Sequence, residues 1–190
     1  NLSPLDPWKF SRSEIEARRK LPELAAFMRK YLPGMENSVL VAGGYGIGVR
    51  ESRRLRGRYT LTGDDYFRRA DFEDAIAYYS YPVDMHAAVP EEGAKMESNY
   101  QKWRYKNGEC YGIPYRCLLP DNLDNLAVAG RAVSADRIMM ASVRLMPPCF
   151  ATGQAAGTAC AIAVKERVNL GEVDAGKLRN KLKEQGCYLK

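Results

Sequence analysis

The segment whose residue types and spacing point most clearly to chemistry lies near the carboxyl end, where Pro147-Pro148 precede Gly153 and Gly157. A helix that starts abruptly after two prolines leaves several backbone N–H groups without intrahelical partners. With the helix dipole, these groups form a site for negative charge. The two glycines lie four residues apart on one helical face, which permits close packing against a strand, a helix or a ring. A tightly packed core helix explains the same pattern equally well.

A second glycine-rich stretch, residues 43–48, follows a predicted strand and has the spacing of a phosphate-binding loop. It fails both phosphate motifs. The dinucleotide fingerprint G-x-G-x-x-G needs a third glycine where Val49 stands. The P-loop needs Lys followed by Ser or Thr where the chain has Val49-Arg50. We therefore interpret this stretch as a bend between strands at which the backbone passes close to a neighbour.

The basic run from Arg50 to Arg58 carries much of the net charge of +6. Such a run suits an anionic partner, and it raises an alternative in which the protein is a non-enzymatic binding module that holds an anionic polymer. No recognised nucleic-acid module surrounds the run, so we expect no nucleic-acid partner. Arginines that face solvent or grip a carboxylate explain the same residues.

The composition is that of a soluble globular chain with one domain or two small ones. Of 190 residues, 46% are hydrophobic and 27% are charged, and five cysteines accompany a single histidine. Without a Cys-x-x-Cys pair, we expect no disulfide framework, no thioredoxin-like motif and no metal site. The uncharged run 145–164 contains proline and glycine, so we expect a buried helix and no membrane span. No signal peptide opens the chain, which favours a cytoplasmic location, and the start at Asn1 suggests an excised fragment.

Hydrophobic periodicity predicts a mixed α/β chain, with strands in the middle and a strand-turn-helix-helix unit at the end. We expect a first helix after the capping box Ser11-x-x-Glu14, kinked or restarted at Pro22 and ended by Pro33-Gly34. The expected strands cover residues 38–42, 59–62, 75–83, 111–119 and 126–129. A short helix should follow the turn at 62–65, and longer ones should cover residues 135–146, 149–167 and 174–185.

A set of motifs occurs in one order along the carboxyl-terminal half: Leu126-Ala-Val-Ala-Gly-Arg131, Ser134-Ala, Ser142-Val-Arg144-Leu-Met-Pro147, Cys149 and Gly153-Gln-Ala-Ala-Gly157. Earlier segments agree with them, namely Gly48-Val-Arg50-Glu-Ser-Arg-Arg, Asp74-Ala-Ile-Ala, Pro82-Val-Asp84-Met-His86 and Ile113-Pro-Tyr-Arg116. Together they resemble FAD-dependent oxidoreductases of the glutathione-reductase-like two-domain superfamily. The resemblance covers about Ser11 to Val164. It implies FAD as cofactor and hydride transfer between flavin and an unidentified organic small molecule.

The resemblance lacks one part, because the amino-terminal strand and G-x-G-x-x-G turn of the family are absent. The chain therefore resembles the carboxyl-terminal portion of such an enzyme. Residues 1–120 would be the later part of the substrate domain, and residues 121–190 the return to a Rossmann-like FAD-binding domain. The amino-terminal FAD-binding portion of the same protein would be a required partner, and this fragment alone would bind FAD poorly or not at all.

The resemblance implies cofactor contacts at two places. Ala129-Gly130-Arg131 would end the strand that returns to the FAD domain, with backbone N–H groups facing the cofactor. The helix start at Thr152–Ala156 would point at the flavin pyrimidine edge, where its dipole stabilises the negative charge of reduced flavin. The implied cofactor-binding residues are Ala129, Gly130, Arg131, Ser134, Thr152, Gly153, Gln154, Ala155 and Ala156.

On the substrate side, the resemblance implies His86, Arg50, Arg116 and Arg144 as catalytic candidates. His86 has an unperturbed pKa near neutrality and can move a proton. An arginine can hold a substrate carboxylate with two hydrogen bonds. Purely structural roles explain the same residues. Cys149, at a helix N-terminus, is expected to have a lowered thiol pKa, although an inert small residue would also fit there, and the absence of Cys-x-x-Cys argues against a disulfide reductase.

Overall fold

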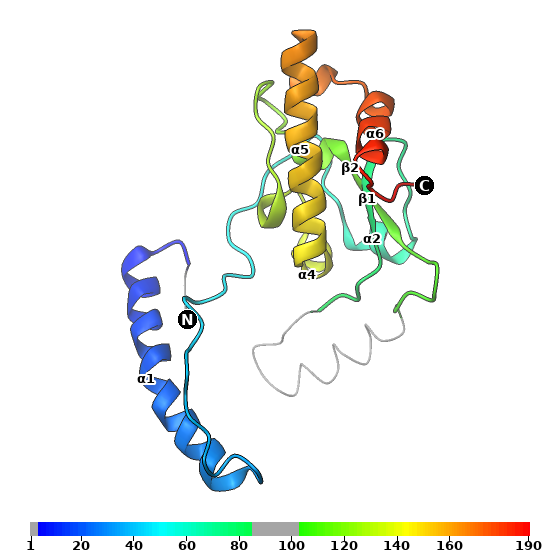
Figure 1. The fold of residues 1–190 in the computed structure, drawn as a ribbon. Coiled ribbons are helices and arrows are strands. Elements are labelled where there is room, and N and C mark those ends of the chain that lie inside the picture. Colours follow the sequence, from blue (N-terminus) through cyan, green and yellow to red (C-terminus); the bar gives the residue numbers. More distant parts are fainter. Residues whose placement is uncertain (1–3, 85–102) are drawn as a thin grey trace. The chain divides into compact units, whose positions relative to one another are not determined.

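The computed structural model describes residues 4–84 and 103–190. The chain divides into two compact units, residues 1–52 and residues 53–190. Figure 1 shows the helices and strands of each unit.

Unit 1 is built on one long helix, α1 (Pro7–Tyr31). The helix starts at Asp6, whose carboxylate accepts the N–H groups of Trp8 and Lys9 at 3.1 Å each. Proline at the first helical position needs no N–H partner and has the helical φ already. The expected start at Ser11 is therefore wrong, because Ser11 lies inside α1.

The predicted kink and stop in α1 have different outcomes. The helix continues through Pro22, so the proline does not divide it into two. It ends at Leu32, immediately before Pro33-Gly34, as predicted. Gly34 has a φ of 87°, in the left-handed region that favours glycine.

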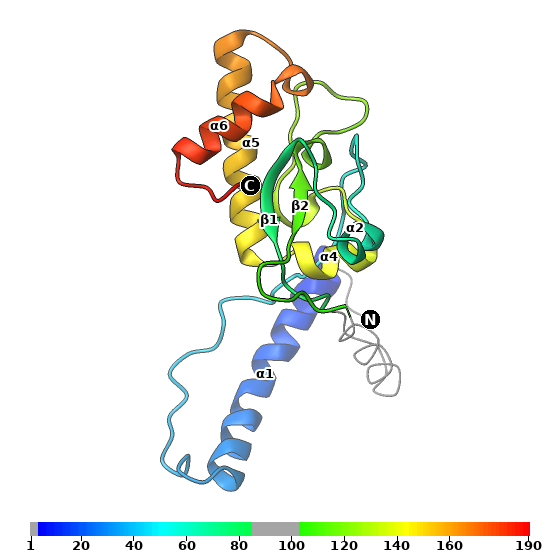
Figure 2. The same ribbon diagram turned by 90° about the vertical axis from the view of Figure 1, so that its right-hand side faces the viewer.

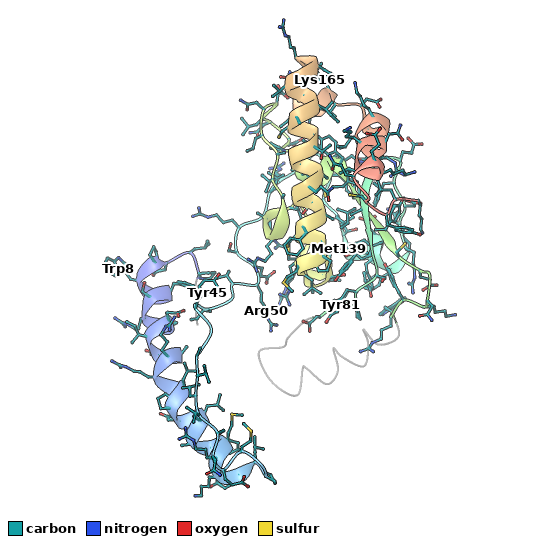
Figure 3. The ribbon with its side chains drawn as sticks, in the orientation of Figure 1. Trp8, Tyr45, Arg50, Tyr81, Met139 and Lys165 are labelled. Carbon is teal, nitrogen blue, oxygen red and sulfur yellow. The ribbon has the colours of Figure 1, made fainter. Side chains whose placement is uncertain are left out.

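The chain then returns along α1 without forming the strand predicted at residues 38–42. Arginines of α1 hold this return through backbone carbonyls, with Arg29 donating to Ser38 O at 2.7 Å and Arg18 to Tyr45 O at 2.6 Å. No residue of α1 is buried. Rings such as those of Trp8 and Tyr45 remain exposed (Figure 3), and residues 4–52 contain no buried side chain that could form a core.

Unit 2 contains a small antiparallel sheet of β1 (Ala75–Tyr79) and β2 (Tyr111–Pro114). β1 is shorter than the predicted 75–83 strand because Tyr81 and Asp84 bond to residues of helix α4 (Arg137–Val143) instead of to a strand. β2 ends at a proline, which cannot extend the ladder. The chain continues as the 3₁₀ helix η1 (Tyr115–Leu118).

Two helices lie side by side next to this sheet (Figures 1 and 2), namely α5 (Met146–Glu166) and α6 (Ala175–Glu184). Both contact β1. Leu178 and Leu182, four residues apart on α6, are fully buried in the core that the helices share with the sheet. Helices with a small sheet confirm the predicted mixed α/β class.

The strands predicted at 59–62 and 126–129 are wrong, because Leu61 makes a single isolated pairing in the first segment and residues 126–129 make none. Gly57 bridges Pro120 and Leu61 bridges Ala135, one residue pair each. The second segment runs into the 3₁₀ helix η2 (Gly130–Ala132). An added Cβ at Gly57 would lie 2.8 Å from Ser134 Cβ, so the backbone at Gly57 lies too close to Ser134 for any side chain at position 57.

An aromatic cluster fills the core beside β2. The Tyr66 ring stacks on Tyr105 with centroids 4.6 Å apart and lies 5.8 Å from Tyr111. Phe67 extends the cluster to Trp103, whose ring is 4.8 Å away. This cluster joins the short helix α2 to the sheet.

Aspartates fix the starts of α2 (Gly63–Phe67) and α4 (Arg137–Val143). Asp136 accepts Met139 N–H at 2.7 Å with one carboxylate oxygen and Gly63 N–H at 2.8 Å with the other. One carboxylate thus caps α4 and holds the start of α2 against it. The sequence correctly predicts the turn at 62–65 and the short helix after it.

Asp65 completes the capping box of α2 and is only 1% exposed. It accepts hydrogen bonds from Thr62 N–H at 2.8 Å, from the Tyr59 hydroxyl at 2.9 Å and from Arg68. Burial alone would raise the pKa of Asp65, but these donors favour the charged form and lower its pKa below the usual value.

We expect Asp65→Asn to lower the free energy of unfolding by about 2–3 kcal/mol, because an amide leaves buried donors without an acceptor. Asp64→Asn, at the exposed neighbouring position, is the control and should change stability by less than about 0.5 kcal/mol. Urea unfolding followed by circular dichroism measures both.

The pH dependence has a definite sign. A carboxyl with a lowered folded pKa contributes stability above its unfolded pKa of about 4 and loses it as pH falls through the folded value. The stability gap between the wild type and Asp65→Asn should therefore shrink at acid pH. A gap that stays constant from neutral pH to about pH 2 would contradict this assignment.

Candidate functional site

The 129–131 loop and the first turns of α5 are joined by hydrogen bonds. Gly130 donates its N–H to Thr152 Oγ1 at 3.0 Å, and the Thr152 hydroxyl donates to Pro148 O at 2.7 Å. Gly130 has a φ of 69°, which favours glycine. Two of the predicted cofactor-binding residues are therefore adjacent, and the Gly130 N–H is already used by Thr152.

Helix α5 begins at Met146, before the two prolines and not after them, which corrects the expected start. The prolines provide no N–H groups, and Cys149 N–H donates to Leu145 O at 3.1 Å. Residues 152–156 lie well inside the helix, where N–H groups bond to the preceding turn. The predicted helix start at Thr152–Ala156 is therefore wrong, and the backbone N–H groups of these residues are not free to bind an anion.

Cys149 is half-buried beside Gly130, with its Sγ 3.8 Å from the position of a Cβ added at the glycine. Its thiol donates to Arg144 O at 3.4 Å. Burial raises the pKa of Cys149, and the nearby positive charge of Arg131 only partly opposes this. The expectation of a lowered thiol pKa is wrong, because burial outweighs the helix terminus.

The remaining cofactor candidates do not share one face. Ser134 is fully buried, where its Oγ accepts Gly57 N–H at 3.1 Å and contacts Thr60 Oγ1 at 3.1 Å. Ala155 is fully buried in the core. Four others are at least partly accessible at the surface, and these are Ala129, Arg131, Gly153 and Ala156.

Gln154 is exposed but bonded within unit 2. Its side-chain amide donates to Gln185 Oε1 at 2.9 Å, which also lies 3.3 Å from Thr158 Oγ1. These contacts tie α5 to the end of α6. Gln154 therefore has a structural role in this arrangement.

One face of α5 is apolar and open to solvent. Phe150 is 73% exposed and Val164 is 80% exposed, with Gly153 and Gly157 between them. In the part of the chain that the structure describes, nothing lies within 4 Å of a Cβ added at either glycine. This exposed apolar face is suited to close packing against another apolar surface.

Arg116 is held by unit 2 itself. Its Nε lies 3.5 Å from Asp74 Oδ2, and its guanidinium lies over the Tyr59 and Phe72 rings at 4.9 and 5.7 Å. Binding a substrate carboxylate would compete with this ion pair. The contacts favour a structural role for Arg116.

The other three catalytic candidates belong to different parts of the chain. Arg144 is largely buried in unit 2 and donates to Asp84 O at 2.8 Å. Arg50 is exposed in unit 1 (Figure 3). His86 lies outside the described residues.

The basic run does not form one free strand. The boundary between the units falls between Ser52 and Arg53, inside the run. Arg54 donates to Ala135 O at 3.0 Å, and Arg58 bonds Asp124 at 3.1 Å. These arginines fasten their segment to unit 2, which does not support the polymer-binding alternative.

Sequence reasoning gave no role to a polar pair in the core. The Tyr111 hydroxyl lies 2.9 Å from Ser142 Oγ, and the Ser142 hydroxyl donates to Tyr81 O at 2.7 Å. A buried serine and tyrosine so far apart in sequence give no spacing signal. The only signal was a serine in an otherwise apolar helix.

Residues 4–84 and 103–190 contain no group of three His, Cys, Asp or Glu side chains that could hold a metal ion. Within the same residues, no helix combines the length and the apolar character that crossing a bilayer requires.

We expect native alkylation by iodoacetamide to modify Cys160 first and Cys149 at least about tenfold more slowly, because the exposed thiol is accessible and burial raises the pKa of Cys149. Cys117 should react last, since it is fully buried and burial raises its pKa strongly. Peptide mass spectrometry over time measures the order. Cys149 reacting as fast as Cys160 would restore the lowered-pKa interpretation.

Comparisons with known proteins agree with the sequence motifs. Comparison with curated proteins gave no match, and comparison with solved structures gave none either. A protein-family model described as FAD dependent oxidoreductase matches residues 1–182. This match spans nearly the whole chain, including the 129–131 loop and α5. The chain therefore belongs to the FAD dependent oxidoreductase family, whose function is flavin-linked redox chemistry with FAD as cofactor.

Proposed function

We propose that the chain is the carboxyl-terminal part of an enzyme that transfers hydride between flavin and an organic substrate bearing a carboxylate. The observation that carries this proposal is the family match over residues 1–182. When bound, the flavin supplies the hydride acceptor or donor. The residues of this chain bind and orient the reactants and move protons.

The fit to a flavin is best at the corner of the 129–131 loop and α5. Gly130, at a φ of 69°, turns the backbone where a flat ligand can approach without a Cβ in its way. The Arg131 side chain is exposed beside it and can offset negative charge. Gly153 lies on the same exposed face of α5 as Phe150, and nothing lies within 4 Å of a Cβ added at Gly153 among the described residues. We assign cofactor contact to Ala129, Gly130, Arg131 and Gly153, and a supporting role to Thr152.

The open face of α5 supports the proposal that a further portion of the protein completes the site. The chain contains no G-x-G-x-x-G sequence, so the ADP half of FAD needs backbone donors from elsewhere. Phe150, Gly153, Gly157 and Val164 form an apolar face on which such a portion can pack closely. We therefore propose an amino-terminal FAD-binding portion as the partner of this face.

The substrate-side roles are divided by chemistry. We propose His86 as the group that gives or takes a proton at the atom next to the one that exchanges hydride. Arg50, which is exposed, is the candidate for holding a substrate carboxylate. Arg116, bound to Asp74, is assigned a structural role in unit 2 and no contact with substrate.

The protein produced from its complete reading frame is expected to show the visible absorption of bound flavin, which should bleach on reduction with dithionite. The 190-residue chain alone, titrated with FAD under the same conditions, is the control and should bind weakly or not at all. A complete protein that is colourless and also fails to bind added FAD would contradict the flavoenzyme proposal.

Gly130→Ala should weaken FAD binding by the complete protein at least about tenfold. The left-handed backbone conformation costs alanine about 1–2 kcal/mol more than glycine, so the 129–131 loop must move. Gly186→Ala is the matched control, since Gly186 has a φ of 87° in the same unit and follows the end of α6. Equilibrium FAD titration and thermal unfolding separate the two effects. Equal losses of affinity in both variants would remove Gly130 from the cofactor site.

A further inference from the structure

Unit 1 contains a run of backbone, from Val39 to Gly44, whose N–H and C=O groups have no hydrogen-bond partner among the described residues. The bonds that hold this part of the chain lie on either side of the run, at Ser38 O and at Tyr45 O. A row of unpaired donors and acceptors is what the edge of a strand presents, and it is a template for pairing with another strand.

The 39–44 run is close to the extended conformation that pairing requires. Contacts with α1 advance from Arg29 to Glu14 while the returning chain advances from Ser38 to Ile47. This is about 22 Å of helix axis, so each residue of the return covers roughly 2.5 Å. A strand covers about 3.3 Å per residue and a helix about 1.5 Å. None of the glycines between residues 43 and 48 has a positive φ, so all of them can join a strand.

The side chains of the run are apolar and open to solvent. Val39 is 77% exposed and Val41 is 93% exposed, and Tyr45, which follows the run, is fully exposed. Valine and tyrosine suit a pleated surface, and pairs of such residues across two strands stabilise a sheet. The strand predicted at residues 38–42 therefore has suitable side chains and lacks only a neighbouring strand.

The charges around the run favour a second copy of the chain in the antiparallel orientation. Residues 37–49 contain no charged side chain, so two copies of the run meet without like charges. Glu36 precedes this stretch and Arg50 follows it. An antiparallel pair sets the acidic end of each copy beside the basic end of the other, whereas a parallel pair would set like charges together.

Unit 1 also exposes enough apolar surface for a stable dimer. Phe27 and Tyr31 on α1 are 53% and 57% exposed, in addition to the fully exposed Tyr45. At about 150–250 Å² per aromatic side chain, these three rings offer roughly 300–500 Å² in each copy. The exposed valines and leucines of the same unit add to this area. Two copies together can therefore reach the roughly 1,200–2,000 Å² that specific, stable interfaces bury.

We propose that residues 39–44 of two copies of this chain pair as antiparallel strands about a two-fold axis. α1 lies along one side of the run, where a Cβ added at Gly43 would lie 2.6 Å from Leu21 Cδ1. The other side is open, so the association closes at two copies. It supplies partners for the unpaired backbone groups and covers apolar side chains of unit 1. No step of this inference depends on flavin, so it is independent of the proposed function.

The oligomeric state of the 190-residue chain tests the inference. Analytical ultracentrifugation over a range of concentrations should show a dimer of twice 21.3 kDa that dissociates on dilution. Val41→Lys should raise the dissociation constant at least about tenfold, because the two new charges would lie close to the two-fold axis. Val39→Lys has the same expected effect, and it replaces Val41→Lys if circular dichroism shows that this variant does not fold.

Val164→Lys is the matched control, because Val164 is exposed to a similar extent, at 80%, but lies on α5 in unit 2. It should leave the dissociation constant unchanged. If it weakens the dimer as much as Val41→Lys does, the contact lies on α5 and the inference is wrong.

Hydrogen exchange locates the contact within unit 1. About every second amide between residues 39 and 44 should become protected as the concentration of the chain rises, and Val41→Lys should abolish this protection. A chain that stays monomeric at all concentrations would overturn the inference, and so would a dimer whose 39–44 amides exchange freely. Protection of these amides in a monomer would mean that another part of the same chain covers the run, which would also overturn it.

Discussion

Burying the Asp65 carboxylate is the constraint around which much of unit 2 is arranged. An ionised carboxylate at 1% exposure needs several donors at once, and residues 59–68 provide them. Tyr59, which donates one of these bonds, also packs edge-on against Phe72 and beneath Arg116. The charge at the start of α2 is thereby linked to the entrance of β1. Loss of this centre would loosen both the helix and the sheet.

Local chemistry was predictable where the partners are close in sequence. The turn at 62–65 supplies its own cap, and α6 has both a capping aspartate at its start and an apolar pair, so both were found. The strand at 38–42 failed because β-branched residues show a preference for extended structure but not whether a neighbouring strand exists. Ser11 and Asp6 are both able to cap a helix, and the proline after Asp6 moves the start.

The candidate site was predictable only in part, for the same reason. Gly130 and Thr152 were predicted as cofactor contacts from the family resemblance, and the structure places the two residues in contact with each other. Ser134 and Arg116 belong to equally clear motifs, but their side chains are occupied by Gly57 and by Asp74. Residue type tells which bonds a side chain can make, and only the fold tells which it has made. That distinction separates a supporting residue from one that contacts a ligand.

The placement of the two tryptophans has a spectroscopic consequence. Trp8 lies in unit 1 with its ring exposed, and Trp103 lies in unit 2 against the Phe67 ring. Intrinsic fluorescence therefore combines one reporter from each unit, with different surroundings. Replacing Trp8 by phenylalanine would leave an emission signal that belongs to unit 2 alone. The cooperativity of each unit could then be followed in the intact chain, without cutting it at residue 52.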